Sequence, residues 1–316
     1  MPPPSRDRSQ HDVFALALAL ERFDVRLAGG ASPADARSAA GIHRVELRGG
    51  GRAYLKVTAA AVGRSRAEAE RELRFYRGAA PAAPVLTPAL LDTLVVDEGV
   101  ALLLEDAGEQ RDAAAWSRDR WRALGRDLAR LHGMALPAGD WARPDDLLSA
   151  LAVPDLGPVL EFWSGHLPRL DDLLADRTAL GDRLGTVPPV FVHGDCHTAN
   201  VVHRTAGGHD VLVFCDWQAA GVGRATSDLA LLSVRATPSG ARVPAVLVEE
   251  YLVERARAGS ARDGTEFRRL LALEELAVLV FQWPPYAAYN GPAAVARVRR
   301  RARYLAARYL AERVSG

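Results

Sequence analysis

The chain has 316 residues, 49% of them hydrophobic, and its 40 basic and 39 acidic residues give a formal net charge of +1. Length and apolar content predict one large or two modest domains, and the near-neutral charge argues against binding to nucleic acid or an anionic membrane. Two cysteines exclude a secreted disulfide framework. The apolar run Val13–Leu20 ends at Glu21 and Arg22, and no run reaches the ~20 residues that span a bilayer. We therefore expect a soluble cytoplasmic protein with no membrane partner.

The first third of the chain predicts strands around one main helix. Apolar residues at helical spacing predict a helix over residues 11–22. The elements expected after it are an alternating strand at Phe23–Ala28, a loop at Gly29, Gly30 and Pro33, two strands at Ile42–Leu47 and Ala53–Val57 around a glycine turn, a helix at Ala67–Arg77, and strand-like Leu94–Leu104 around a turn.

After Gly108 the pattern becomes mainly helical. The expected helices are Ala115–His132, Pro158–Ala175, Ala245–Ala258, Phe267–Phe281 and residues 293–312, and a β-rich segment, Val190–Trp217, interrupts them. This order predicts an α+β fold with two lobes: a small β-rich N-lobe at 1–104 with one main helix, a connection at 105–108, and a larger, mostly helical C-lobe at 109–316.

The strongest motif is the stretch from Phe191 to Val202, which places Asp195 and Asn200 five positions apart after an apolar strand. A second apolar strand, Val211–Cys215, leads directly into Asp216. Phosphoryl transfer uses such a set: one carboxylate accepts the hydroxyl proton, and an amide with a second carboxylate holds the metal on the phosphates.

His193, Gly194, Asp195 and Asn200 resemble the HGDxxxxN motif of the aminoglycoside phosphotransferase and choline kinase family, whose fold is protein-kinase-like. The resemblance implies that Asp195 is the catalytic base and that Asn200 and Asp216 bind Mg²⁺. It also implies that His193 shapes the loop and that Asp228, in Ser227–Ala230, supports the loop from below. The alternatives are turn residues between buried strands, or a zinc site drawn from His193, Cys196, His197 and Cys215, whose spacing fits no common zinc pattern.

Lys56 is the only lysine in the chain, in the alternating strand around Tyr54 and Val57. A strand lysine is usually solvated, but a compact ammonium contacts phosphate oxygens in a way that arginine replaces poorly. By resemblance, Lys56 is the ATP-phosphate lysine of the third strand. Its acidic partner is expected among Glu68, Glu70 and Glu72, and Glu72 best matches the helix pattern of the family.

The remaining nucleotide contacts are also implied by the resemblance. The segment Leu102–Gly108 resembles the hinge between lobes, where Leu104 and Asp106 would offer main-chain groups to adenine. The loop Gly30–Ala34 resembles a short phosphate loop, and either Ser32 or Ser38, or neither, would lie at the phosphates. His132 is expected to be structural.

The resemblance implies an enzyme that uses ATP, or alternatively GTP, with Mg²⁺ to phosphorylate a hydroxyl of a small molecule, as a monomer or homodimer. An antibiotic acceptor is the first expectation, and choline, a sugar or a similar alcohol is the second. Carboxylates would suit a polycation, and the candidates are Asp145, Asp146, Glu161, Asp171, Asp172, Glu274 and Glu275. Aromatic residues such as Phe281, Trp283, Tyr286 and Tyr289 would instead suit choline. A catalytically inactive binding protein is a third reading, disfavoured because all the expected active-site residues are present.

Overall fold

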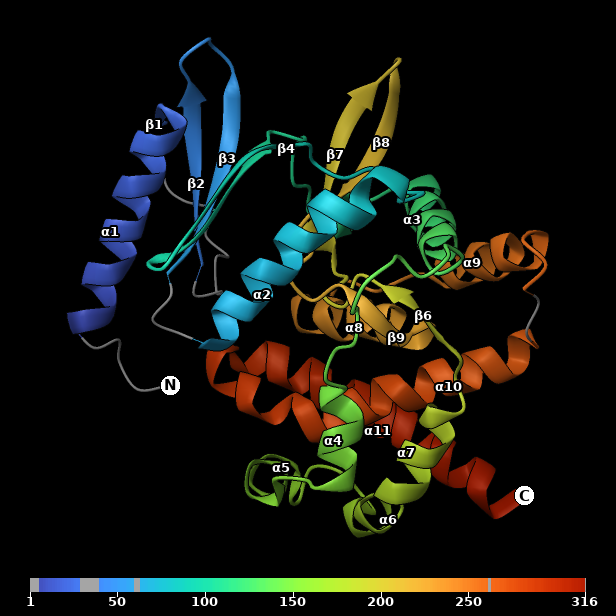
Figure 1. Cartoon of the computed structure of the whole chain (residues 1–316). Helices are drawn as coiled ribbons and strands as arrows, with labels where there is room; N and C mark the ends of the chain where they lie inside the picture. The colour runs from blue at the N-terminus through green and yellow to red at the C-terminus, as the bar shows by residue number, and fades with distance from the viewer. Residues whose placement is uncertain (1–5, 29–39, 60–62, 261–262, 316) are drawn as a thin grey trace. The chain divides into compact units, whose positions relative to one another are not determined.

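The computed structural model describes residues 6–28, 40–59, 63–260 and 263–315 (Figure 1). Within it the chain forms two compact units. Unit 1 comprises residues 1–109 and 202–220, and unit 2 comprises residues 110–201 and 221–316. The fold is α+β, as the sequence predicts, with a sheet in one unit and mostly helices in the other.

Unit 1 contains an antiparallel sheet with the strand order β1-β2-β3-β5-β4. Its elements are α1 (Arg6–Phe23), β1 (Val25–Leu27), β2 (Ala40–Leu47), β3 (Arg52–Ala59), α2 (Gly63–Arg74), which continues as a wider π-helical turn at Phe75–Ala79, β4 (Leu90–Val96), β5 (Gly99–Glu105), β7 (Val201–Ala206) and β8 (His209–Phe214).

The two faces of this sheet carry different helices. Side chains alternate along β3, so Leu55 and Val57 join the core under Ala15 and Ala19 of α1. Lys56 points to the opposite face, where α2 packs against β3 and β5 (Figure 1). The alternation predicted for this strand therefore places the lysine toward the helix expected to carry its acidic partner.

The hairpin β7–β8 belongs to unit 1 although it follows much of unit 2 in sequence. Glu109 and His203 exchange backbone hydrogen bonds at 2.9 and 2.8 Å. Gly108 has a φ of +141°, and a Cβ there would lie 2.2 Å from the carbonyl oxygen of His203. Glycine thus permits the close approach that attaches the hairpin to the end of β5.

Unit 2 is mostly helical. Its elements are α3 (Arg118–Leu131), α4 (Asp146–Ala152), α5 (Leu156–Trp163), α6 (Leu170–Ala175), α7 (Arg177–Gly185), β6 (Pro189–Val192), β9 (Gly221–Arg224), α8 (Ala225–Ala236), α9 (Ala245–Arg257), α10 (Gly264–Ala277), which continues as a π-helical turn at Val278–Gln282, and α11 (Pro292–Ser315). No helix in the described ranges combines the length and apolar character needed to cross a bilayer.

The core of unit 2 gathers side chains from α4, α5, α7, α10 and α11. Trp163 is fully buried there, and its indole N–H donates to the carbonyl oxygen of Val280 at 3.1 Å. The strands β6 and β9 pair antiparallel, from Pro189 with Arg224 to Val192 with Gly221. This pairing brings the start of α8 to the strand that precedes the Asp195 motif.

The prediction of one helix over Pro158–Ala175 is wrong. Helix α5 ends at Trp163 and α6 begins at Leu170. Between them Gly165 has a φ of +71° and Arg169 a φ of +57°. Both are left-handed values that no α-helix continues through, and Pro168 removes a further backbone donor. The apolar spacing runs through this break, which is why periodicity alone misses it.

Candidate active site

Lys56 forms a buried charged cluster within unit 1. Its ammonium lies 2.6 Å from the carboxylate of Glu72 on α2 and 2.7 Å from that of Asp216, which follows β8. The Lys56 side chain is 6% exposed and the Glu72 side chain 1%. Two carboxylates and one ammonium leave the cluster with a net negative charge, which suits the approach of a cation.

The ammonium of Lys56 stays charged in this setting. Burial by itself would lower the pKa of Lys56, but attraction and hydrogen bonding to Glu72 and Asp216 raise it above its ordinary value. The raised pKa means that Glu72 and Asp216 stabilise the protonated ammonium of Lys56.

Asp216 is held in an uncommon backbone conformation, with a φ of +65°. The next residue, Trp217, donates its backbone N–H to Glu72 at 3.2 Å, and its ring stacks on Phe75 with centroids 3.8 Å apart. Lys56 engages Oδ1 of Asp216, and in the described part of the chain no hydrogen bond or ion pair engages Oδ2. The Asp216 side chain is 21% exposed, so a hard carboxylate oxygen remains for an ion such as Mg²⁺.

The loop after β6 is held by Asp228, a fully buried residue in the first turn of α8. Its carboxylate accepts the backbone N–H groups of His193 and Gly194, each at 2.8 Å. Gly194 has a φ of +82°, a left-handed value that glycine adopts without steric cost. Asp228 therefore fixes the turn from which Asp195 projects.

His132, directly after α3, contacts the carboxylate of Asp228, and Tyr251 of α9 contacts His132 in turn. His132 Nε2 lies 3.1 Å from Asp228 Oδ2, and His132 Nδ1 lies 3.0 Å from the hydroxyl of Tyr251. Burial alone would raise the pKa of Asp228, but its hydrogen bond and attraction to His132, and further contacts at the loop, lower it. Asp228 is thus an ionised anchor, and His132 and Tyr251 support it in turn. No local sequence signal identifies Tyr251.

Asp195 itself is ionised and partly accessible, with 31% of its side chain exposed. The amide nitrogen of Asn200 donates to its backbone carbonyl at 2.9 Å and to its carboxylate at 3.2 Å. Burial would raise the pKa of Asp195, but interactions with His197, His193 and Arg235 lower it. A carboxylate held in this way can orient a hydroxyl group and accept its proton.

The predicted site residues therefore fall into two sets. Lys56, Glu72 and Asp216 meet within unit 1, and His193, Asp195, Asn200 and Asp228 meet within unit 2.

The predicted contacts to adenine also remain predictions. Leu104 lies in β5 between β3 and β4, and Asp106 follows the end of that strand. Ser32 and Ser38 lie outside the described residues.

The alternative of a zinc site that uses Cys196 and Cys215 is not supported by the state of their thiols. Burial raises the pKa of the Cys215 thiol to about 12 and that of Cys196 well above its ordinary value, so both stay protonated. Across the residues that the structure describes, no group of three or more histidine, cysteine or acidic side chains has the arrangement of a metal site. Cys196 is fully buried in unit 2, where it packs as a small hydrophobic residue.

Several acidic residues expected to meet a cationic acceptor are paired with arginine instead. Arg224 contacts Glu274 at 2.6 Å and also pairs with Asp145, whose carboxylate accepts the backbone N–H of Leu148 at the start of α4. Arg301 holds Glu275 through two bonds of 2.7 and 2.6 Å. These carboxylates are therefore engaged by arginine within unit 2.

Of the four aromatic residues considered for a choline cage, two are buried and two are exposed. Phe281 and Trp283 are buried, and Trp283 packs against Phe162 with centroids 5.3 Å apart. Tyr286 and Tyr289 are exposed. Core packing therefore accounts for the first two.

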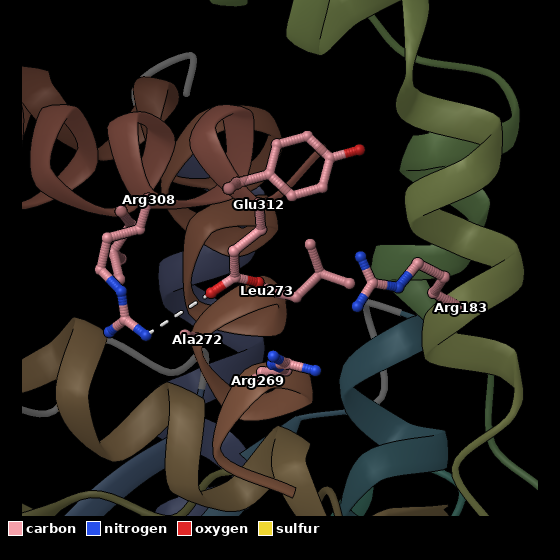
Figure 2. A pocket seen from close by; sticks show the side chains of 8 residues that line it. Arg183, Arg269, Ala272, Leu273, Arg308 and Glu312 are labelled. Atoms are coloured by element: carbon pink, nitrogen blue, oxygen red, sulfur yellow. Dashed lines mark ion pairs between the residues drawn. The ribbon is translucent and has the colours of Figure 1, made fainter. Parts of the chain in front are cut away.

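A separate small cavity lies among α7, α10 and α11 of unit 2 (Figure 2). Figure 2 shows Arg183, Arg269 and Arg308 around it, with Arg308 paired to Glu312 at 3.8 Å. None of the predicted site residues lines this cavity.

A model described as "Phosphotransferase enzyme family" matches residues 37–271. A search of curated proteins by sequence finds no match.

Three solved structures illustrate the similarity in fold. A microcompartment-associated aminopropanol kinase is 17% identical, with a TM-score of 0.63 over 95% of this chain and 98% of that one. Macrolide 2'-phosphotransferase MphH from Brachybacterium faecium is 18% identical, with a TM-score of 0.57 over 91% and 97%. Aminoglycoside phosphotransferase APH(3'')-Id from Streptomyces rimosus, in complex with ADP and streptomycin, is 23% identical, with a TM-score of 0.53 over 84% and 98%. These similarities show a protein-kinase-like α+β fold.

Proposed function

The chain belongs to the phosphotransferase enzyme family, and from this premise we propose that it transfers the γ-phosphoryl group of ATP to a hydroxyl group of a small molecule. GTP is the alternative donor. The observation that carries the proposal is Asp195, an ionised and partly exposed carboxylate in a loop anchored by Asp228. Phosphoryl transfer relies on positioning and charge, and a fixed carboxylate next to the acceptor provides both.

Within unit 1 we assign nucleotide binding to the Lys56 cluster. The ammonium of Lys56 would contact phosphate oxygens, and Glu72 would keep it oriented, since the two side chains lie 2.6 Å apart and are buried. Leu104 and Asp106 would offer main-chain groups to adenine, and Ser32 or Ser38 would approach the phosphates. Residues 1–104, 105–108 and 109–316 would then serve as nucleotide lobe, hinge, and catalytic and acceptor lobe.

Within unit 2 we assign the proton-accepting role to Asp195. His193 keeps the loop in shape, because its Nδ1 accepts the backbone N–H of Asp195 at 3.3 Å. Asp216 and Asn200 would supply the oxygen ligands of Mg²⁺, a hard cation that prefers carboxylate and amide oxygens. When bound, Mg²⁺ would neutralise the charge on the phosphates.

The acceptor is proposed as a small alcohol. An antibiotic remains the first candidate and choline, a sugar or a related metabolic alcohol the second. A catalytically inactive binding protein is less well supported, because the lysine, the base and both metal-ligand candidates are present in the sequence. We further propose that the protein acts in the cytoplasm as a monomer or homodimer, without nucleic-acid or membrane partners.

The proposal is tested by measuring the melting temperature with ATP alone, Mg²⁺ alone and both together. A ligand that binds the native state raises its stability by mass action, so we expect the largest rise with ATP and Mg²⁺ combined. ATP consumption with a panel of alcohols then tests transfer. No shift at millimolar ATP and Mg²⁺, together with no ATP consumption, would reject the proposed function.

A further inference from the structure

Two basic side chains lie beside Asp195 that the proposed mechanism does not use. His197 is buried, and its Nε2 lies 3.6 Å from Oδ1 of Asp195. The same Nε2 lies 3.3 Å from a guanidinium nitrogen of Arg235, in the last turn of α8. All three residues belong to unit 2.

A hydrogen bond joins these two basic side chains. A guanidinium group can only donate, so Nε2 of His197 must accept from Arg235. His197 thus joins the guanidinium of Arg235 to the carboxylate of Asp195 through one imidazole ring. The permanent positive charge beside the proposed base is therefore that of Arg235, which contributes to the lowered pKa of Asp195.

Arg235 is also available to a ligand. Its side chain is exposed, whereas His197 between it and Asp195 is buried. Among the described residues, no carboxylate forms an ion pair with Arg235. By contrast, Arg224 and Arg301 are already engaged by Glu274, Asp145 and Glu275.

The charges near the base therefore do not favour a polycation. Three of the carboxylates that would attract one are paired with arginine: Asp145, Glu274 and Glu275. The exposed Arg235 lies one imidazole ring away from Asp195 instead. An anionic group on the acceptor would be repelled by Asp195 alone, and the guanidinium of Arg235 offsets that repulsion while binding carboxylate or phosphate oxygens in its planar fork.

We propose that Arg235 is a specificity-determining residue that selects acceptors bearing a carboxylate or phosphate group close to the hydroxyl that is phosphorylated. This inference rests on the proposed function, because it concerns the acceptor of the same reaction. It names hydroxy acids and phosphorylated alcohols as the substrate class, and it assigns Arg235 to binding the acceptor and not to the transfer step.

The test compares alcohols of matched length and opposite charge. Glycolate is paired with ethanolamine, and 3-hydroxypropionate with 3-aminopropanol, while glycerol 3-phosphate distinguishes phosphate from carboxylate. ATP consumption with Mg²⁺ gives kcat and KM for the wild type, Arg235→Ala and Arg235→Glu. The matched control is Arg303→Glu, which makes the same charge change at an exposed position on α11.

We expect the wild type to favour the anionic member of each pair by about tenfold or more in kcat/KM, as expected for a charge-assisted contact. Arg235→Glu should reverse this preference, mainly through KM, and Arg303→Glu should keep it. The melting-temperature rise with ATP and Mg²⁺ should be the same in all variants. A preference for the amines, no turnover of either member in every pair, or an unchanged preference in Arg235→Glu would overturn the inference. Failure of the proposed function differs, because ATP and Mg²⁺ would then produce no shift in any variant.

Discussion

The ammonium of Lys56 lies 2.7 Å from Oδ1 of Asp216, although the two residues are 160 positions apart in the chain. One was predicted to bind phosphate and the other to bind Mg²⁺. Their direct contact fixes the two charges against each other before any ligand binds. Under the proposed function, a magnesium nucleotide would exchange part of this ion pair for contacts with phosphate and metal.

Asp216→Ala should abolish phosphoryl transfer while the protein remains folded. The substitution removes the proposed metal ligand, but Lys56 keeps Glu72 as a buried partner at 2.6 Å. Steady-state ATP consumption with an accepted alcohol measures the first effect, and circular dichroism with thermal melting checks the second. Near-wild-type turnover in this variant would be incompatible with the proposed role of Asp216.

Lys56→Met should destabilise unit 1 because it leaves the carboxylate of Glu72 buried without its ammonium partner. Removing one partner of a buried pair costs about 3–5 kcal/mol. The double variant Lys56→Met with Glu72→Gln removes the uncompensated charge and should recover part of that loss. Urea unfolding of the wild type, both single variants and the double variant measures the coupling. If the double variant is no more stable than Lys56→Met, the two side chains are not a coupled pair.

Asp195→Asn should lower kcat by about a hundred- to ten-thousand-fold, the usual contribution of a general base. The amide keeps the shape of the side chain but cannot accept a proton, and the Lys56 cluster of unit 1 is untouched. ATP affinity, measured by titration, should therefore stay close to that of the wild type.

Lys56→Ala is the contrasting variant, because it should weaken ATP use in affinity or positioning. Should Asp195→Asn instead weaken ATP binding and keep turnover at saturation, Asp195 would be a metal ligand or a structural residue. The base would then have to be another acidic residue of unit 2.

Asp228→Asn should destabilise the protein by about 2 kcal/mol or more, because the carboxylate accepts two backbone N–H groups and the ring of His132. The pKa of Asp228 is lowered in the folded state. Its contribution is therefore fully present above the unfolded value of about 3.9 and is lost as pH falls through the lower folded value. Urea unfolding from pH 6 down to pH 3 should show the gap between wild type and variant closing in acid. A gap that does not change with pH would contradict an ionised Asp228.

The sequence predicts much of the fold and of the candidate site, because these features have local signatures. Alternation along β3 predicts which face carries Lys56, and the spacing from Asp195 to Asn200 marks the loop after β6. Helical periodicity predicts α3 and α9 to within a few residues of Arg118–Leu131 and Ala245–Arg257. Each of these signals depends on residues that are close together in the chain.

Features that depend on tertiary contact are missed. The short strand β9 (Gly221–Arg224) has too few residues to show a period, yet its pairing with β6 positions the start of α8. Tyr251 contacts His132, and Arg235 contacts His197, across separate elements of the fold. No local sequence pattern predicts either contact. The identity of the acceptor falls in the same class, since it depends on side chains brought together by folding.

The hairpin β7–β8 lies in unit 1 while the residues before and after it lie in unit 2. The polypeptide therefore passes between the units three times, and no single cut in the gene separates them. A fragment that ends at residue 109 would lack its second segment, and a fragment that begins at residue 110 would contain a foreign insertion. An engineer who wished to exchange the acceptor half with that of another family member would have to graft two stretches, 110–201 and 221–316, around a retained hairpin. In a chain built this way, recombination at any one crossover would leave at least one unit assembled from two parents.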